Sequence, residues 1–180
     1  MAVVSVEIDC SGGRIKVQSP YNPEFVRGAK LLGGKWERPY WTFDFRDEDR
    51  VRDLCVRIYG EGAATATGFT APVARCTLRV TLLAVGSSAW SGYARTTSLV
   101  VAGRPVARVF GRDSGCKLSE GVIVDSGSIG SGGSRKNPGI IWDAGTVLIV
   151  RDVPLDTQHK VQALGDGELH DIEATIEVLP

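Results

Sequence analysis

The sequence has no excess of charge of either sign. Its 21 Lys and Arg residues balance its 21 Asp and Glu residues, so the formal net charge at pH 7 is zero. A protein that binds nucleic acid over a broad surface is usually strongly basic. Any nucleic-acid contact must therefore come from a local patch rather than from the chain as a whole.

Residues that build metal or catalytic centres are also scarce. None of the four cysteines forms a CxxC pair, and His159 and His170 lie far from all of them. This spacing argues against a zinc site, and we expect no metal and no cofactor. The segment GRDSGC, 111–116, faintly resembles a serine-protease nucleophile segment, but Ser114 would need a histidine held by a carboxylate. Both histidines lie in polar, loop-like surroundings, so we expect a protein that is not an enzyme.

The sequence lacks long apolar runs. It begins with the alternating pattern VVSVEIDC, without the basic segment or the apolar stretch of a signal peptide or a membrane span. We therefore expect no membrane association and a cytoplasmic location.

Residues 1–62 have the pattern of an α+β module with the element order ββαβα. Alternation on both sides of the SGG turn predicts a β-hairpin. Asn22 and Pro23 mark the start of a helix, and Gly33 or Gly34 marks its end. Residues 41–45, WTFDF, alternate like a half-buried strand, and 46–60 predict a second helix that begins acidic. The expected core is apolar and follows these periods: Val4, Val6, Ile8, Cys10, Ile15, Val17, Phe25, Val26, Ala29, Leu32, Trp41, Phe43, Phe45, Val51, Leu54, Cys55 and Ile58.

Residues 63–71 have the small, polar, turn-rich composition of a linker, so the domain boundary is placed there. Residues 72–180 are expected to form an all-β domain, either a sandwich or a partly open barrel. The segments that predict its strands alternate or are short and apolar: 77–83, 98–110, 121–126, 139–150 and 171–180.

The most biased segment is DSGSIGSGGSRKNPG, 125–139. It matches neither GxxxxGK[ST] nor a GxGxxG that opens a helix, so it does not predict a nucleotide site. Two interpretations remain: a flexible hairpin loop, or a mobile basic finger that places Arg135 and Lys136 on phosphates or on a partner. Residues 126–136 are expected to be poorly ordered without a partner, because glycine and serine have little to bury, and low mobility would favour a structural turn over a binding finger.

The stretch GGKWERPYWTFDF, 33–45, sets aromatic residues among basic ones. Trp41 belongs to the alternating strand and is expected in the core. Trp36 and Tyr40 lie around Pro39, where the alternation is not yet established. They can stack on bases or contact a partner beside Lys35 and Arg38, or they can simply pack.

The order hairpin, helix, GGKWERPYWTFDF, helix resembles the HARP domain of annealing helicases and the short HARP-like proteins of bacterial mobile elements. The matching features are Phe25, the Gly34–Lys35–Trp36 turn, the WTFDF strand and the acidic start of the following helix. The resemblance covers about the first third of the chain. The family binds DNA, with a preference for structures that join single and double strands. The resemblance therefore implies a contact set on the first helix and the following turn: Arg27, Lys30, Lys35, Trp36, Arg38 and Tyr40.

From these observations we expect a non-enzymatic, nucleic-acid-binding accessory protein. Its N-terminal module would contact single-stranded or forked DNA, and its C-terminal β-domain would supply self-association or a surface for a partner protein. The alternative is a protein–protein interaction factor, such as an inhibitor or an assembly component, that binds no nucleic acid.

Overall fold

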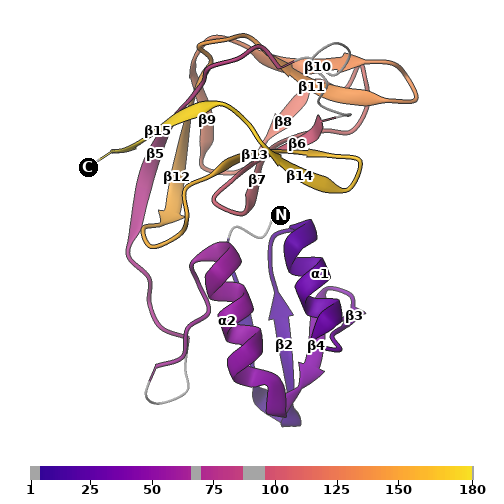
Figure 1. Ribbon diagram of the computed structural model, residues 1–180, viewed down its shortest axis with the longest axis vertical. Helices are drawn as coiled ribbons and strands as arrows, with labels where there is room; N and C mark the ends of the chain where they lie inside the picture. Colours follow the sequence, from indigo (N-terminus) through magenta and orange to yellow (C-terminus); the bar gives the residue numbers. More distant parts are fainter. Residues whose placement is uncertain (1–4, 66–69, 87–95, 180) are drawn as a thin grey trace. The chain divides into compact units, whose positions relative to one another are not determined.

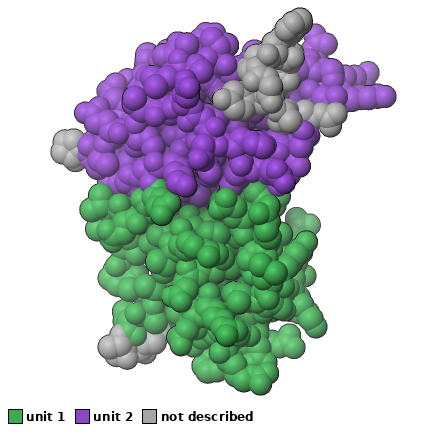
Figure 2. Space-filling model, in the orientation of Figure 1, with its two compact units in different colours: residues 1–74, 154–158 green, residues 75–153, 159–180 purple. Residues whose placement is uncertain are grey.

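The computed structural model (Figure 1) describes residues 5–65, 70–86 and 96–179. The chain divides into two compact units (Figure 2). Unit 1 consists of Met1–Ala74 and Pro154–Gln158, and unit 2 of Arg75–Val153 and His159–Pro180. Most of the described residues in regular structure are in antiparallel strands, which confirms the expected α+β class with a β-rich remainder. The boundary at 63–71 stays a prediction, since the units divide after Ala74 and residues 66–69 lie outside the described ranges.

Unit 1 has the element order ββαββα, one strand more than the sequence predicts. Its elements are β1 (Glu7–Asp9), β2 (Arg14–Gln18), α1 (Pro23–Leu31), β3 (Lys35–Glu37), β4 (Tyr40–Asp44) and α2 (Glu48–Tyr59), with short 3-10 turns at Ser11–Gly13 and Phe45–Asp47. The extra strand is β3, which pairs antiparallel with β4 across the two-residue turn Arg38–Pro39. The sheet order is β1-β2-β4-β3, so β3 lies at an edge.

The helix ends in unit 1 follow the sequence closely. The Asn22 side chain caps α1 by accepting hydrogen bonds from the backbone N–H groups of Glu24 (2.8 Å) and Phe25 (3.2 Å). Helix α2 ends at Gly60, which has the left-handed φ of 68° that glycine adopts without steric cost. The predicted caps at these two positions are confirmed.

The core of unit 1 lies between one face of the sheet and the two helices. Its members are fully or almost fully buried and come from both layers: Val6, Ile15, Val17, Phe25, Ala29, Trp41, Phe43, Val51, Leu54, Cys55, Ile58 and Tyr59. Phe45 was expected among them, but its side chain is 48% exposed. The strand ends at Asp44 and the chain turns into a 3-10 helix, so the alternation that would bury Phe45 stops one residue too early. Val4 lies outside the described residues.

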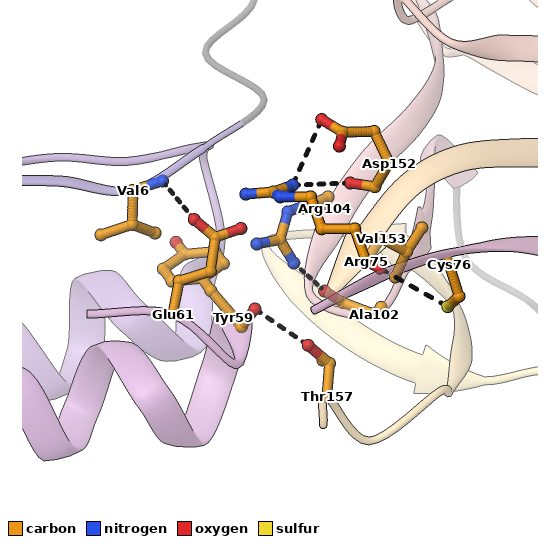
Figure 3. A network of polar contacts seen from close by, with 10 residues as sticks. All are labelled: Val6, Tyr59, Glu61, Arg75, Cys76, Ala102, Arg104, Asp152, Val153 and Thr157. Carbon is orange, nitrogen blue, oxygen red and sulfur yellow. Dashed lines mark hydrogen bonds and ion pairs between the residues drawn. The ribbon is translucent and has the colours of Figure 1, made fainter. Parts of the chain in front are cut away.

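Unit 2 is built from antiparallel sheets around a second core, and no barrel closes among its described strands. One sheet has the order β15-β5-β12-β9, another the order β14-β13-β6-β7-β8, and β10 and β11 form a two-stranded ribbon. The strands are β5 (Arg75–Leu82), β6 (Thr96–Val101), β7 (Arg104–Val109), β8 (Cys116–Leu118), β9 (Val122–Ser126), β10 (Ile129–Gly133), β11 (Pro138–Trp142), β12 (Val147–Pro154), β13 (Val161–Gly165), β14 (Glu168–Asp171) and β15 (Ala174–Leu179). Arg75 and Asp152 fasten β5 to β12 by an ion pair of 3.2 Å (Figure 3).

The glycine-rich segment differs from the predicted loop. Residues 129–133 form β10, which pairs residue for residue with β11. The turn between the strands is closed by two backbone hydrogen bonds of 3.0 Å between Ser134 and Asn137. Ladder pairing satisfies the backbone groups even where the side chains have little to bury. The prediction of a loop is therefore wrong for 129–133, while the poor order expected for 126–136 stays a prediction.

The two residues that precede the predicted linker, Glu61 and Gly62, are buried. Glu61 is 4% exposed, and its carboxylate accepts a hydrogen bond of 3.0 Å from the Val6 backbone N–H (Figure 3). Unit 1 also includes the later segment Pro154–Gln158, in which the Thr157 hydroxyl donates to the Tyr59 carbonyl at 2.9 Å. No local pattern in the sequence indicates either contact.

Candidate nucleic-acid interface

The β3–β4 hairpin carries most of the predicted contact residues. Lys35 and Trp36 are on β3, Arg38 is in the turn and Tyr40 begins β4. Successive side chains of a strand point to opposite faces of the sheet. Lys35 therefore faces away from the helices beside Thr42, whereas Trp36 lies on the helix-covered face beside Trp41. The structure thus separates two residues that the sequence places side by side.

Trp36 is an exposed indole that rests on a buried one. The Trp36 side chain is 55% exposed, and its ring centroid is 5.7 Å from that of Trp41, which is only 8% exposed. Trp41 in turn packs edge-on against Phe25 at 6.4 Å. This contact restrains Trp36 at the sheet edge while more than half of it reaches solvent. An exposed aromatic face held in this way is what stacking on an unpaired base requires.

Helix α1 brings two of the predicted cations to the same side of the sheet. Gly28 lies against Leu54 of α2, so this side of α1 faces its partner helix. Side chains three or four residues apart share a helix side. Val26 and Lys30 therefore lie on the side of α1 away from α2, and Lys30 and Arg27 are exposed. We refer to the predicted contact residues on the helix side of the sheet and in the β3–β4 turn, Arg27, Lys30, Trp36 and Arg38, as the Trp36 edge.

The opposite, open face of the sheet has mixed charge. Lys16, Thr42 and Lys35 lie in register across β2, β4 and β3. Arg14 forms an ion pair with Glu37 at 3.7 Å. Acidic and basic side chains alternate over this face: Glu7, Asp9, Arg14, Lys16, Lys35, Glu37 and Asp44. This balance makes the open face a poor surface for phosphates.

Tyr40 lies on this open face rather than on the Trp36 edge. Its side chain is 37% exposed and lines a hollow of about 320 Å³ with Glu7, Asp9 and Lys16. Of the predicted set, the structure therefore brings Arg27, Lys30 and Trp36 to the helix side, with Arg38 in the turn. It places Lys35 and Tyr40 on the other side of the sheet.

A buried ionic cluster in unit 1 was missed at the sequence level. The Arg52 side chain is 6% exposed and donates to the Glu48 carboxylate at 2.8 Å and to the Gly62 carbonyl at 2.9 Å. The hydrogen bond from Arg52 holds the pKa of Glu48 below its usual range. The i,i+4 spacing of Glu48 and Arg52 in a predicted helix was the available indication.

The cysteines beside this cluster are not activated nucleophiles. Burial and the Glu48 carboxylate raise the pKa of Cys10, although the thiol lies close to Arg52. Burial raises the pKa of Cys55 to about 12. A reactive thiol needs a lowered pKa, so the cluster supports the fold rather than a covalent reaction.

In unit 2, Arg135 and Lys136 are exposed in the turn of the β10–β11 ribbon, at the place that the basic-finger interpretation requires. Ser114 has a local structural role: its hydroxyl donates to the Gly111 carbonyl at 2.8 Å and accepts from the Gly111 N–H at 3.0 Å. Across 5–65, 70–86 and 96–179, no group of His, Cys, Asp and Glu side chains is arranged to hold a metal ion.

No protein-family model, curated protein or solved structure matches the chain. Neither helix that the structure describes is long and apolar enough to cross a membrane. Function is therefore inferred from the geometry of the chain, and the resemblance of its first third to the HARP domain stays an expectation from the sequence.

Proposed function

We propose that unit 1 binds single-stranded or forked DNA through the Trp36 edge, and that the protein acts as a non-enzymatic accessory factor. The observation that carries the proposal is Trp36 itself. A large aromatic side chain that is 55% exposed contributes little free energy of burial to folding. Its contact with buried Trp41 restrains it in one place, which reduces the entropy lost when a base stacks on it.

The charge around Trp36 supports the same ligand. Apart from Lys35 and Glu37, which lie on the open face, residues 23–40 contain three basic side chains, Arg27, Lys30 and Arg38, against the acidic Glu24. Glu37 already forms an ion pair with Arg14 on the open face. The neutral chain thus contains a local basic segment, which attracts phosphates without making the whole protein basic.

Single strands and forks fit this edge better than duplex does. In a duplex both faces of each base are buried in the stack, whereas an unpaired base can place one face on Trp36. Each phosphate contact to a single strand makes the decrease of log affinity with log salt steeper by about 0.7. The few cations of the Trp36 edge therefore predict moderate affinity with a shallow salt dependence.

The test is fluorescence anisotropy of labelled single-stranded, duplex and forked DNA at two salt concentrations. We expect Trp36→Ala to weaken single-strand and fork binding by about 1–3 kcal/mol while leaving the salt slope nearly unchanged. We expect Lys30→Ala to weaken binding to every sequence and to reduce the slope by about 0.7. Tyr40→Ala, on the open face, is the matched aromatic control and should bind like the parent.

Stability measurements separate a binding defect from an unfolding defect. Trp41→Ala removes a core side chain and should cost roughly 3–5 kcal/mol of the free energy of unfolding. If Trp36→Ala costs as much, Trp36 is part of the core wall and the proposal fails. It also fails if the Trp36 and Lys30 variants both bind DNA like the parent.

The alternative function, protein–protein interaction without nucleic acid, is favoured by a different observation. A groove between α1 and α2 has the apolar lining residues Leu31, Leu32, Leu54 and Val56, flanked by the charged Arg50, Asp53 and Arg57, and Leu31 is 83% exposed. An apolar helix groove is a common site for a partner peptide. If no variant of the Trp36 edge changes DNA binding but Leu31→Ser abolishes association with a protein, this function replaces the first.

A further inference from the structure

Unit 2 exposes an aromatic side chain beside a cation on the β7–β8 hairpin. Phe110, directly after β7, is 68% exposed. The Lys117 ammonium lies 5.5 Å from the centroid of the Phe110 ring, within the range of a cation–π contact. Val109 is 6% exposed and belongs to the core, whereas Phe110, the residue after the strand, lies in solvent beside Lys117.

A second cation lies beside Lys117 on the neighbouring strand. Arg108 is the direct cross-strand partner of Lys117 in the β7–β8 register. Like charges placed opposite each other on neighbouring strands destabilise a sheet. Within the described ranges, no carboxylate forms an ion pair with either side chain. A bound anion would relieve this repulsion, and Lys117, the partner of Arg108, also lies beside the Phe110 ring.

The loop that follows Phe110 is held in place by hydrogen bonds. The Ser114 hydroxyl accepts a hydrogen bond from the Gly111 N–H and donates one to the Gly111 carbonyl. The Ser131 hydroxyl on β10 donates to the Arg112 carbonyl at 2.6 Å. These contacts restrain the backbone next to the ring, and the β7–β8 pairing places Arg108 opposite Lys117, so less order has to be created when a ligand binds.

We propose that Arg108, Phe110 and Lys117 form a second binding site for single-stranded DNA. One unpaired base stacks on the Phe110 ring, and the two cations contact the phosphates that flank it. An aromatic face among basic residues is the combination that proteins use for single strands without sequence preference. A purely acidic peptide would use the cations and leave the ring without a stacking partner. The site lies in unit 2 and does not depend on the Trp36 edge.

The test uses the full chain and fluorescein-labelled oligothymidylate of about 10 and about 40 nucleotides, the shorter close to the span of one module. We expect Phe110→Ala to weaken binding of the longer strand about 5- to 100-fold, and Phe110→Leu to weaken it nearly as much because leucine keeps the apolar bulk without a ring. Lys117→Ala should reduce the salt slope by about 0.7. Ile123→Ala, another exposed apolar residue of unit 2, should bind like the parent.

Introducing the same changes into a Trp36→Ala chain separates the two sites. If both sites exist, the long strand binds to the parent more tightly than to either single variant, because two linked sites add avidity. If Trp36→Ala is silent and Phe110→Ala weakens binding, the proposal for unit 1 fails and this one stands. The proposal for unit 2 is overturned if the Phe110 and Lys117 variants bind DNA as tightly as Ile123→Ala does, both in the parent chain and in the Trp36→Ala chain. It is also overturned if polyglutamate competes as well as oligothymidylate of equal charge.

Discussion

Trp36 and Trp41 are direct cross-strand partners, but they differ in solvent exposure. Trp41 is 8% exposed, whereas Trp36 is 55% exposed, although both lie on the helix-covered face. Trp41 is on a central strand and packs against Phe25 of α1, while Trp36 is on the edge strand. Position in the sheet, not residue type, decides which indole is available to a ligand.

The buried Arg52 predicts how stability responds to acid. The pKa of Glu48 is lowered in the folded state by its hydrogen bond from Arg52. The ionised Glu48 carboxylate contributes fully to the free energy of unfolding above the usual carboxyl pKa near 4.5. This stabilisation is lost as the pH falls through the lower folded-state pKa. We expect Glu48→Gln to cost about 1–3 kcal/mol of unfolding free energy at pH 7, because a hydrogen bond to a charged group is lost.

Urea denaturation at pH 7, 5 and 3.5, followed by tryptophan fluorescence, measures this effect. The difference between the parent and Glu48→Gln should shrink as the pH falls. Glu7→Gln, an exposed carboxylate on the open face, is the control and should change neither stability nor its pH dependence appreciably. A Glu48→Gln chain with the stability and pH profile of the parent would contradict the role of this cluster.

The end of α1 needs two glycines for two different reasons. Gly33 has a left-handed φ of 72° with no atom near the place of a side chain. Gly34 has an ordinary backbone, but a Cβ there would lie 2.5 Å from Phe43 Cε1 and 2.8 Å from the Ala29 carbonyl oxygen. From the sequence, either Gly33 or Gly34 was expected to end the helix. The structure uses the first for its conformation and the second for a close approach to β4.

Substitutions at these two positions should therefore behave differently. Gly33→Ala should cost about 1–2 kcal/mol of unfolding free energy through its left-handed backbone, and Gly33→Asn less, because asparagine tolerates this conformation. Gly34→Ala should cost about 1–3 kcal/mol through overpacking, and Gly34→Asn at least as much, because its side chain is larger. Urea unfolding of the four variants provides the comparison. If asparagine is less destabilising than alanine by the same amount at both positions, one mechanism acts at both.

At the scale of the whole molecule, the core of unit 1 is continuous in sequence. All of its described buried members lie between Val6 and Tyr59, although Pro154–Gln158 also belongs to the unit. We expect residues 1–74, expressed alone, to unfold cooperatively in urea, with Trp36 and Trp41 as probes. Loss of the hydrogen bonds from Thr157 to Tyr59 and from Leu155 to Ala74 should make the fragment less stable by roughly 1–3 kcal/mol.

Adding the missing segment is the control for this fragment. A chain in which residues 154–158 are joined to residue 74 by a short glycine–serine linker should recover part of the lost stability. A fragment 1–74 without cooperative unfolding, in the presence or absence of this addition, would mean that unit 1 cannot fold by itself. The boundary placed at 63–71 would then not separate two domains.

Features that depend on one element were accessible from the sequence alone. The cap at Asn22, the left-handed stop at Gly60 and the inward Leu78, Val80 and Leu82 of β5 all follow predicted patterns. Caps satisfy backbone groups within a few residues, and the period of a strand or helix decides which side chains share a face. These features depend only on residues that are close in the sequence, so they can be predicted without knowing a distant partner.

Features that depend on a distant partner were decided only by the tertiary structure. Strand β3 is three residues long, too short to show a period, and exists through its pairing with β4. Residues 129–133 have no strand composition and obtain their hydrogen bonds from β11. The separation of Lys35 from Trp36 follows from the pairing of β3, because alternation has consequences only once a strand has two faces. The composition of the hairpin was visible in the sequence, but which of its side chains share a surface depended on backbone pairing between separate segments.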